Sequence, residues 1–257
     1  LGLCFLFLYA PIAVLIVFSF NESKNRATFT GFSFKWYKAL FQNDLIMHSL
    51  WNTLLVAVLA SVVATLLGTV AAVGISGMRK RMRSAVMNVT YLPVINPEII
   101  TGISTMLLFV YLKEILHMEL GFLTVLIAHI TFCLPYVILN VLPKLRQMDP
   151  SLYEAALDLG CNPLQAFMKV VVPEIMPGIA SGFLMSFTFS LDDFIITYFT
   201  SGSSFQTLPV TIYSMTRMKI NPQINALSTL MFLFVLTLLL LMNIRKRPRQ
   251  GAARRRA

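Results

Sequence analysis

Long apolar runs separated by short polar segments dominate this chain. Six of these runs come close to the roughly 20 residues that an α-helix needs to cross a bilayer. They lie at about residues 3–20, 51–76, 85–112, 120–142, 177–200 and 226–244. The pattern predicts an all-α fold, a polytopic membrane protein in which residues 1–257 form a single transmembrane domain of six helices.

The composition agrees with a membrane location. Of the 257 residues, 57% are hydrophobic and 12% are charged, which lies outside the usual range of soluble proteins. The net charge of +10 raises the question of nucleic-acid binding, but seven of the 21 basic residues lie in the last 13 positions, directly after an apolar run. A basic segment in that place is typical of a cytoplasmic anchor, so we predict the lipid bilayer as a partner and no nucleic acid.

The basic residues also orient the predicted helices. Segments 77–84 and 143–176 and the C-terminal tail together carry 14 Lys and Arg, whereas segments 21–50, 113–119 and 201–225 carry seven. Cytoplasmic loops of membrane proteins carry the excess of Lys and Arg. This distribution places the first group and both termini in the cytoplasm. The first apolar run lacks a small-residue cleavage site, which indicates an anchor rather than a removed signal peptide.

Two smaller features bear on binding chemistry. The stretch FSFKWYKALFQN in the first outer segment mixes Trp36 and Tyr37 with Lys35 and Lys38. It predicts a helix on the outer membrane interface, with an ordinary connecting loop as the alternative. The three cysteines have neither a CxxC nor a metal-ligand spacing, so we expect packing or incidental thiols and no metal site.

The longest polar interruption, residues 143–176, contains a short helix suited to docking. Asp149 and Pro150 form one helix start, and the spacing of Ser151 to Glu154 is that of a capping box. Gly160 supplies a left-handed stop. Between these signals an apolar face with small central residues consists of Leu152, Ala155, Ala156 and Leu159, while Glu154 and Asp158 share another face. The face allows close approach of a partner, and packing on the same chain is the alternative.

This segment resembles the EAA loop of ABC-importer permeases. Glu154-Ala155-Ala156 is followed after three residues by Gly160 and after nine more by Val170-Val171-Val172-Pro173, with valine at the family's Ile and Leu positions. In that family the loop is cytoplasmic, and its helix fits a groove on the ATP-hydrolysing subunit. The resemblance therefore implies a cytoplasmic coupling helix. Its docking residues in this chain are Glu154, Ala155, Ala156, Asp158, Gly160 and Pro173.

Further stretches, 31–43, 129–138, 186–202 and 208–229, resemble the spermidine/putrescine branch of these permeases, so the likeness covers nearly the whole chain. It implies the ABC type I importer permease fold in a bacterial inner membrane. It also implies a homologous second permease subunit, two cytoplasmic ATP-binding subunits and an extracytoplasmic polyamine-binding protein. The chain has no GxxxxGK[ST] phosphate loop. We therefore expect a transport subunit rather than an enzyme, with no cofactor of its own and ATP on the partner.

Ionisable residues inside the apolar runs predict the transport path. Pro93 and Pro97 interrupt the third run beside Glu98, and Asp192 and Asp193 lie in the fifth. At 1.5 Å per residue, Glu98 and Asp192 lie about 20 Å from the inner end of their helices. Carboxylates at one depth favour a cation, and aromatic faces add cation–π attraction. The candidate path residues are Asp192, Asp193, Glu98, Phe194, Tyr198 and Tyr136.

Other interpretations remain open. In the first, Asp192 or Asp193 caps a helix break instead of lining the path. In the second, Glu98 forms hydrogen bonds with backbone groups that proline leaves unpaired. In the third, His129 is a buried histidine whose hydrogen bonds are made within the helix bundle. A secondary transporter or channel needs no docking helix, and a permease for another small organic cation needs the same acids. An intramembrane aspartyl protease needs aspartates on separate helices, whereas Asp192 and Asp193 are adjacent. Spermidine and putrescine are both candidate substrates.

Overall fold

The computed structural model describes residues 2–23, 28–116, 119–218 and 222–245. In these ranges the regular elements are helices, and one isolated β-bridge joins Asn21 to Phe32. The predicted all-α fold is confirmed. The basic tail that the sequence analysis singled out lies, after Arg245, outside the described residues.

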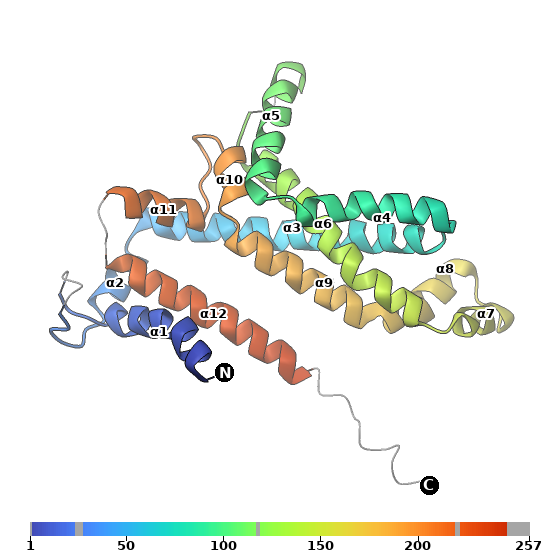
Figure 1. The fold of residues 1–257 in the computed structure, drawn as a ribbon, viewed down its shortest axis with the longest axis horizontal. Coiled ribbons are helices and arrows are strands. Elements are labelled where there is room, and N and C mark those ends of the chain that lie inside the picture. The colour runs from blue at the N-terminus through green and yellow to red at the C-terminus, as the bar shows by residue number, and fades with distance from the viewer. Residues whose placement is uncertain (1, 24–27, 117–118, 219–221, 246–257) are drawn as a thin grey trace, which may run out of the picture. The chain divides into compact units, whose positions relative to one another are not determined.

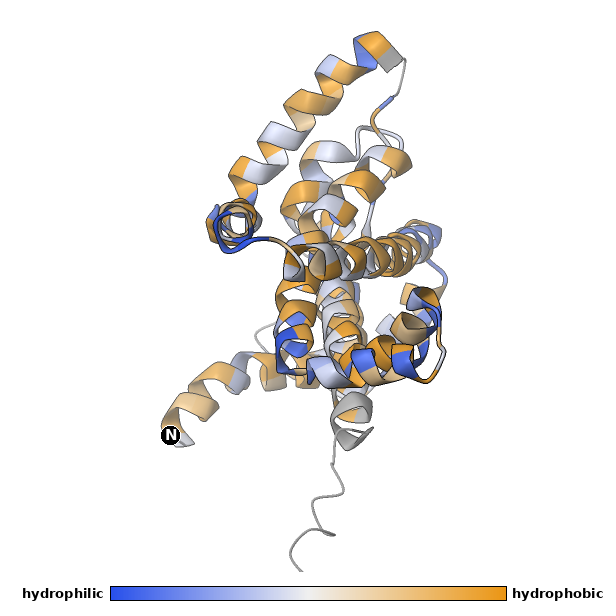
Figure 2. Cartoon of the chain, turned by 90° about the vertical axis from the view of Figure 1, so that its right-hand side faces the viewer, coloured by the Kyte–Doolittle hydropathy of each residue, from blue (hydrophilic) through white to orange (hydrophobic). Residues whose placement is uncertain are grey.

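The helices are numbered in chain order in Figure 1. They are α1 (Gly2–Ser19), α2 (Lys35–Phe41), α3 (Asp44–Ser76), α4 (Lys80–Ile95), α5 (Glu98–Leu116), α6 (Phe122–Gln147), α7 (Pro150–Asp158), α8 (Pro163–Ala166), the π-helical turn η1 (Phe167–Val171), α9 (Val172–Asp192), α10 (Ile195–Thr200), α11 (Leu208–Met218) and α12 (Gln223–Arg245). Most helices are apolar along their length, and hydrophilic residues gather at helix ends and in short connecting helices (Figure 2).

The number of membrane-spanning helices differs from the prediction. Within the described ranges, α1, α3, α6 and the continuous run Pro163–Asp192 are long and apolar enough to cross a membrane, and α4 with α5 makes a fifth span if the pair counts as one. The predicted sixth run falls on α12. The apolar part of this helix, Gln223–Thr237, is shorter than a full span. The count of six is therefore not confirmed.

Two predicted runs are broken rather than straight. The third divides into α4 and α5, which meet at 104°. Asn96 between them is extended (ψ 139°), because a residue before proline is disfavoured in the helical region. The fifth run divides after Asp192, where Asp193 is extended (φ −63°, ψ 123°) before α10 begins. The break agrees with the alternative interpretation, in which one aspartate of the pair caps a helix break, whereas the predicted span 177–200 is not one continuous helix.

Contacts divide the chain into two compact units, residues 1–47 with 212–257 (unit 1) and residues 48–211 (unit 2). In unit 1, α1 lies beside α12, and α2 is the helix predicted from the aromatic and basic stretch. Trp36 is buried and donates from its indole nitrogen to the Asn21 carbonyl at 2.6 Å. Its ring is thus part of the packing of unit 1. The interfacial location of α2, like the single transmembrane domain, stays a prediction.

The core of unit 2 is built around α6. Its buried side chains include Val137, Ile138 and Val141, and α9 packs along it. Glycines allow this close approach: a Cβ on Gly68 of α3 would lie 2.7 Å from Val137, and one on Gly182 of α9 would lie 3.2 Å from the same residue. The close packing of α3, α6 and α9 forms the frame that carries both candidate sites.

Candidate functional site

The coupling-loop helix α7 begins where the sequence predicts it. Asp149 accepts a hydrogen bond from the Ser151 backbone N–H at 3.0 Å, and Pro150 opens the first turn. This bond holds the pKa of the Asp149 carboxyl below its usual range. Ser151 lies inside the helix, so of the two predicted helix starts the one at Asp149 is formed. Gly160 follows the helix with φ +87°, a left-handed conformation that favours glycine.

The side chains of the predicted apolar face of α7 are largely exposed. Ala156 is the residue of this helix that is buried, and Tyr153 packs partly against the core of unit 2. By contrast, Leu152 is 44% and Leu159 87% exposed. Glu154 and Asp158 are exposed as well. The helix therefore rests on its own chain through Ala156 and Tyr153, and it presents leucines and carboxylates outward.

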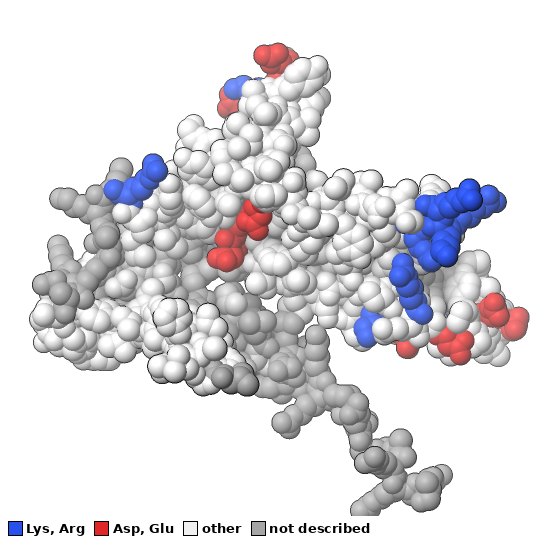
Figure 3. All heavy atoms as spheres, in the orientation of Figure 1, with Lys and Arg blue, Asp and Glu red and all other residues white. Residues whose placement is uncertain are grey.

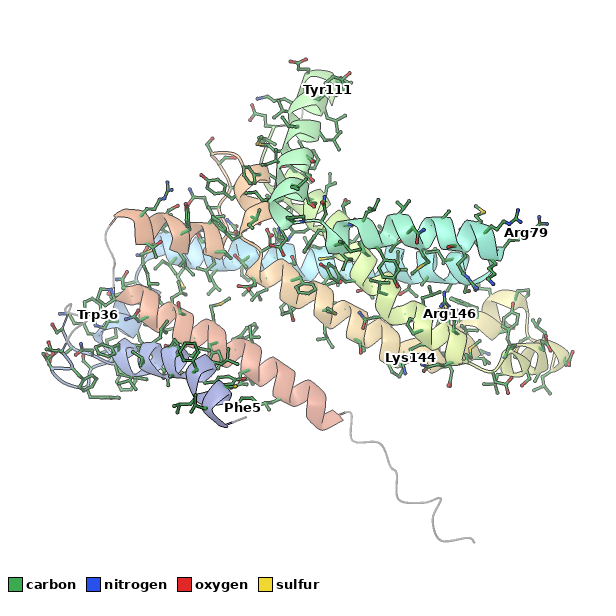
Figure 4. The ribbon with its side chains drawn as sticks, viewed as in Figure 1. Phe5, Trp36, Arg79, Tyr111, Lys144 and Arg146 are labelled. Atoms are coloured by element: carbon green, nitrogen blue, oxygen red, sulfur yellow. The ribbon has the colours of Figure 1, made fainter. Side chains whose placement is uncertain are left out.

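The charged residues of unit 2 concentrate at the end that carries α7. In Figure 3 the basic side chains cover the start of α4 and the end of α6, and acidic side chains lie next to them over α7. Figure 4 shows Arg79 at the start of α4 and Lys144 and Arg146 near the end of α6. The same end thus holds the basic loop 77–84 and the coupling loop.

A second site lies near the middle of unit 2. Glu98, the first residue of α5, and Asp192, the last residue of α9, line one cavity of about 250 Å³. Figure 3 shows an acidic patch near the base of α5, with uncharged residues directly around it. The remaining lining residues are Asp193, Phe132, Phe189, Phe194 and Ile195. Four of the six predicted path residues are therefore brought to a single cavity.

The two adjacent aspartates have different surroundings. The side chain of Asp193 is 3% exposed, and its Oδ2 lies 3.2 Å from Nε2 of His129. Its carboxylate also accepts the backbone N–H groups of Ile196 at 3.2 Å and Thr197 at 2.8 Å, at the start of α10. Asp192 is exposed to the cavity. Neither Asp192 nor Glu98 forms an ion pair within the described part of the chain.

The predicted tyrosines border the cavity without lining it. The ring centroid of Tyr136 lies 4.5 Å from that of Phe189, and Tyr198 lies 5.4 Å from Phe194. Phe132 and Phe189, which do line the cavity, were missed in the sequence. Their spacing is the signal that could have found them, since Phe132 follows His129 by three residues and Phe189 precedes Asp192 by three. Residues three apart share a helix face.

The described residues include no group of three or more His, Cys, Asp or Glu that could hold a metal ion. Cys133 is buried and its thiol donates to the Ser186 carbonyl at 3.4 Å. This contact joins α6 to α9, as expected of a packing thiol.

Fold and sites together define a polytopic helical membrane protein with a short, largely exposed helix, α7, and an acid-lined cavity between its helices. The chain belongs to the family of binding-protein-dependent transport system inner membrane components, whose model matches residues 64–247. It is therefore a transport component of the inner membrane that crosses the bilayer several times. The family assignment made from the EAA loop is confirmed.

Individual relatives indicate the branch of the family to which this chain is similar. The putrescine transport system permease protein PotI of Escherichia coli K12 is 42% identical over 229 residues, covering 88% of this chain and 82% of PotI. The spermidine/putrescine transport system permease protein PotC of the same strain is 37% identical over 234 residues, covering 91% of this chain and 87% of PotC. The resemblance to the polyamine branch is thus confirmed.

Solved structures agree on the fold. A bacterial ABC transporter involved in the import of the acidic polysaccharide alginate matches with a TM-score of 0.72 at 19% identity, covering 96% of this chain and 93% of that chain. The alginate transporter in complex with an alginate pentasaccharide-bound periplasmic protein matches with a TM-score of 0.69 at 20% identity, covering 95% and 89%. The predicted importer permease fold is confirmed.

Proposed function

We propose that this chain is a permease subunit of an ATP-driven polyamine importer. It forms half of the path along which spermidine or putrescine, delivered by an extracytoplasmic binding protein, crosses the membrane. A homologous second permease forms the other half, and two cytoplasmic ATPase subunits hydrolyse the ATP. The observation that carries the proposal is the cavity in which Glu98 and Asp192 meet three phenylalanine rings, in a chain whose relatives include polyamine permeases.

The chemistry of this cavity suits an ammonium group. Carboxylates attract it by charge, and aromatic faces add attraction where water is scarce. The Asp193 carboxylate already interacts with His129 and accepts backbone N–H groups at the start of α10. We therefore assign Asp192 and Glu98 as the carboxylates that bind the cation. Phe194 lines the cavity, and Tyr136 and Tyr198 support its aromatic walls. The alginate importer has a similar fold and an acidic cargo, so the sign of the cargo charge is set by side chains rather than by the fold.

The exposed face of α7 supports the coupling role. Its exposed apolar residues are Leu152, Ala155 and Leu159, and the carboxylates of Glu154 and Asp158 flank them. Ala156 and Tyr153 pack the helix against unit 2. We propose that the groove of an ATPase subunit covers this face and that the basic end of unit 2 is cytoplasmic. Because Pro173 lies in the first turn of α9 and Asp192 at its last residue, one helix about 30 Å long connects the docking loop to the cavity.

The test uses the complex reconstituted in liposomes, with polyamine-stimulated ATP hydrolysis as the readout. We expect Asp192→Asn and Glu98→Gln each to raise the half-saturating polyamine concentration by about tenfold, the order expected when a charged partner is lost. Glu174→Gln is the matched control, an exposed acid in the first turn of the same helix as Asp192. It should leave this concentration unchanged.

Three outcomes would redirect the proposal. Normal half-saturation in both variants would remove the cavity from the path. Stimulation by a different organic cation but not by polyamines would assign another cargo. Uptake that continues without the ATPase subunits would favour a secondary transporter.

A further inference from the structure

We infer that His129 is the positioning residue of the acid cavity. Through Asp193 it holds the break between α9 and α10 in the conformation that directs Asp192 and Glu98 to the cation. The inference rests on the proposed function, because it concerns how the proposed cation site is kept in shape. It starts from a buried group of polar side chains that the transport path does not use.

The group joins α6 to a stretch about 60 residues later in the chain, which comprises the end of α9, the break after it and the start of α10. His129 of α6 is 1% exposed. Its Nδ1 lies 2.7 Å from the Ser190 hydroxyl on α9, and its Nε2 lies 2.9 Å from the Thr197 hydroxyl on α10. The Nε2 atom also lies 3.2 Å from the Asp193 carboxylate in the break between these helices. A single imidazole thus binds the end of α9, the break and the start of α10.

The hydrogen-bond geometry assigns the protons. The Thr197 hydroxyl donates to Asp193 Oδ2 at 2.8 Å, so toward His129 this hydroxyl can only accept. Nε2 of His129 therefore carries a proton, which points to the Thr197 hydroxyl and the Asp193 carboxylate. In the neutral imidazole Nδ1 accepts the Ser190 hydroxyl proton, and every polar hydrogen of the group then has an acceptor.

Asp193 depends on these donors because it is buried. Its carboxylate receives two backbone N–H groups, the Thr197 hydroxyl and His129 Nε2. A buried carboxylate that loses a donor is strongly destabilised. Movement of Asp193 toward water would relieve this cost. Since Asp193 is the extended residue between two helices, its movement would rotate the neighbouring backbone. Asp192 precedes it directly and would turn with it.

Glu98 is held through the same break. A Cβ added to Gly102 of α5 would lie 3.1 Å from the Phe199 ring and 3.4 Å from the Ile195 carbonyl, both on α10. Glu98 is four residues earlier on α5. The position of α10 therefore sets the position of Glu98, and His129 acts on both cavity acids without lining the cavity.

The test is a mutant cycle in the assembled, reconstituted complex. We expect His129→Leu to raise the half-saturating polyamine concentration by about tenfold, the order expected when a buried charged group loses a hydrogen bond, with a smaller effect on the maximal rate. His129→Gln, whose amide can still donate toward Asp193, should recover part of the loss. Thr131→Val is the control, because its hydroxyl bonds to the Ile127 carbonyl of its own helix.

The cycle separates positioning from general destabilisation. In the Asp192→Asn/Glu98→Gln background, His129→Leu should change half-saturation by less than about twofold, because the acids it positions are gone. A full additional loss in that background, or unchanged half-saturation in an assembled His129→Leu complex, would overturn the inference. If His129→Leu does not assemble, Ser190→Ala takes its place in the cycle. It removes the Nδ1 partner that orients the imidazole but leaves the Nε2 donor, so the expected rise in half-saturation is smaller, about threefold, and no rise would overturn the inference.

A second measurement keeps this inference apart from the proposed function. If polyamines do not stimulate the wild-type complex, the proposed function fails, but the position of residue 192 can still be measured. The rate at which a soluble cationic thiol reagent labels Asp192→Cys, with Cys4 and Cys161 replaced by serine, reports that position. A several-fold change in rate on adding His129→Leu supports the inference, and an unchanged rate overturns it.

Discussion

The two ends of α9 present functional chemistry in opposite ways. Before its first turn lies a loop whose predicted docking residues fall mainly within one short stretch, Glu154 to Gly160, and are mostly exposed, with Ala156 buried. At its last residue, Asp192, it meets α5, α6 and α10, and the cavity there takes residues from all four helices. Docking to a partner requires an exposed face, which one short helix can supply. A cation site inside a membrane requires groups converging from several helices.

This difference leads to different sensitivities. The docking end should tolerate changes in packing but not changes in its exposed charges. The cavity end should respond to substitutions that never touch the cation, because its geometry depends on neighbouring helices. The following substitutions test this contrast.

The largest effect is expected for Glu154→Arg. The residue is exposed, so the reversal should leave the fold of this chain intact while placing a wrong charge against the ATPase groove. We expect coupled ATP hydrolysis to fall by about a hundredfold, on the scale of a disrupted interfacial charge contact. Glu114→Arg, an exposed acid on α5, should retain coupling. Normal assembly and coupling of Glu154→Arg would remove the docking role from α7.

An intermediate effect is expected for Gly178→Ala, in the packing between the two ends of α9. The added Cβ would lie 2.8 Å from Lys144 Cγ and 2.9 Å from the Asn140 carbonyl oxygen of α6. Overpacking of this kind costs about 1–3 kcal/mol, so the thermal midpoint of the detergent-purified protein should fall. Gly74→Ala on α3 meets nothing within 4 Å and should leave the midpoint unchanged or raise it. Equal midpoints for the two variants would contradict close α6–α9 packing.

The smallest effect is expected for Phe189→Leu in the cavity wall. Loss of the ring removes a cation–π contribution, which should raise the half-saturating polyamine concentration by about two- to fivefold at an unchanged maximal rate. Phe187→Leu is the matched control, since this half-buried ring is on the same helix, stacks on Phe183 and does not line the cavity. A similar shift in both variants would assign the effect to packing rather than to the cation.

The prediction of the docking segment depended on short-range signals. Asp149, Pro150 and Gly160 set the bounds of α7 through hydrogen bonds and backbone preferences within a few residues. The direction of its contact face was predicted less well. The apolar pattern placed Ala156 together with Leu152 and Leu159, but Ala156 is buried while both leucines are exposed. Periodicity shows which residues share a face but not what covers that face.

The helix breaks illustrate the same limit. Pro97 and the aspartate pair mark where the third and fifth runs are interrupted, and breaks are found at both places. The 104° angle between α4 and α5 has no local cause that can be read from residue types alone. At Gly102, α5 packs closely on α10, a contact between distant segments that residue types do not reveal. The interruption of the third run was therefore predicted, whereas its angle was not.

Local chemistry in the amino-acid sequence was enough to determine the membrane class, the bounds of α7 and the presence of acids within apolar helices, because each depends on neighbouring residues and on overall polarity. The division of roles between Asp192 and Asp193 was decided by tertiary structure. The two residues are adjacent and chemically identical, and only the approach of His129 from α6 buries one carboxylate and leaves the other facing the cavity. A free-energy difference of that kind arises from burial and partners, which are set by packing between distant segments.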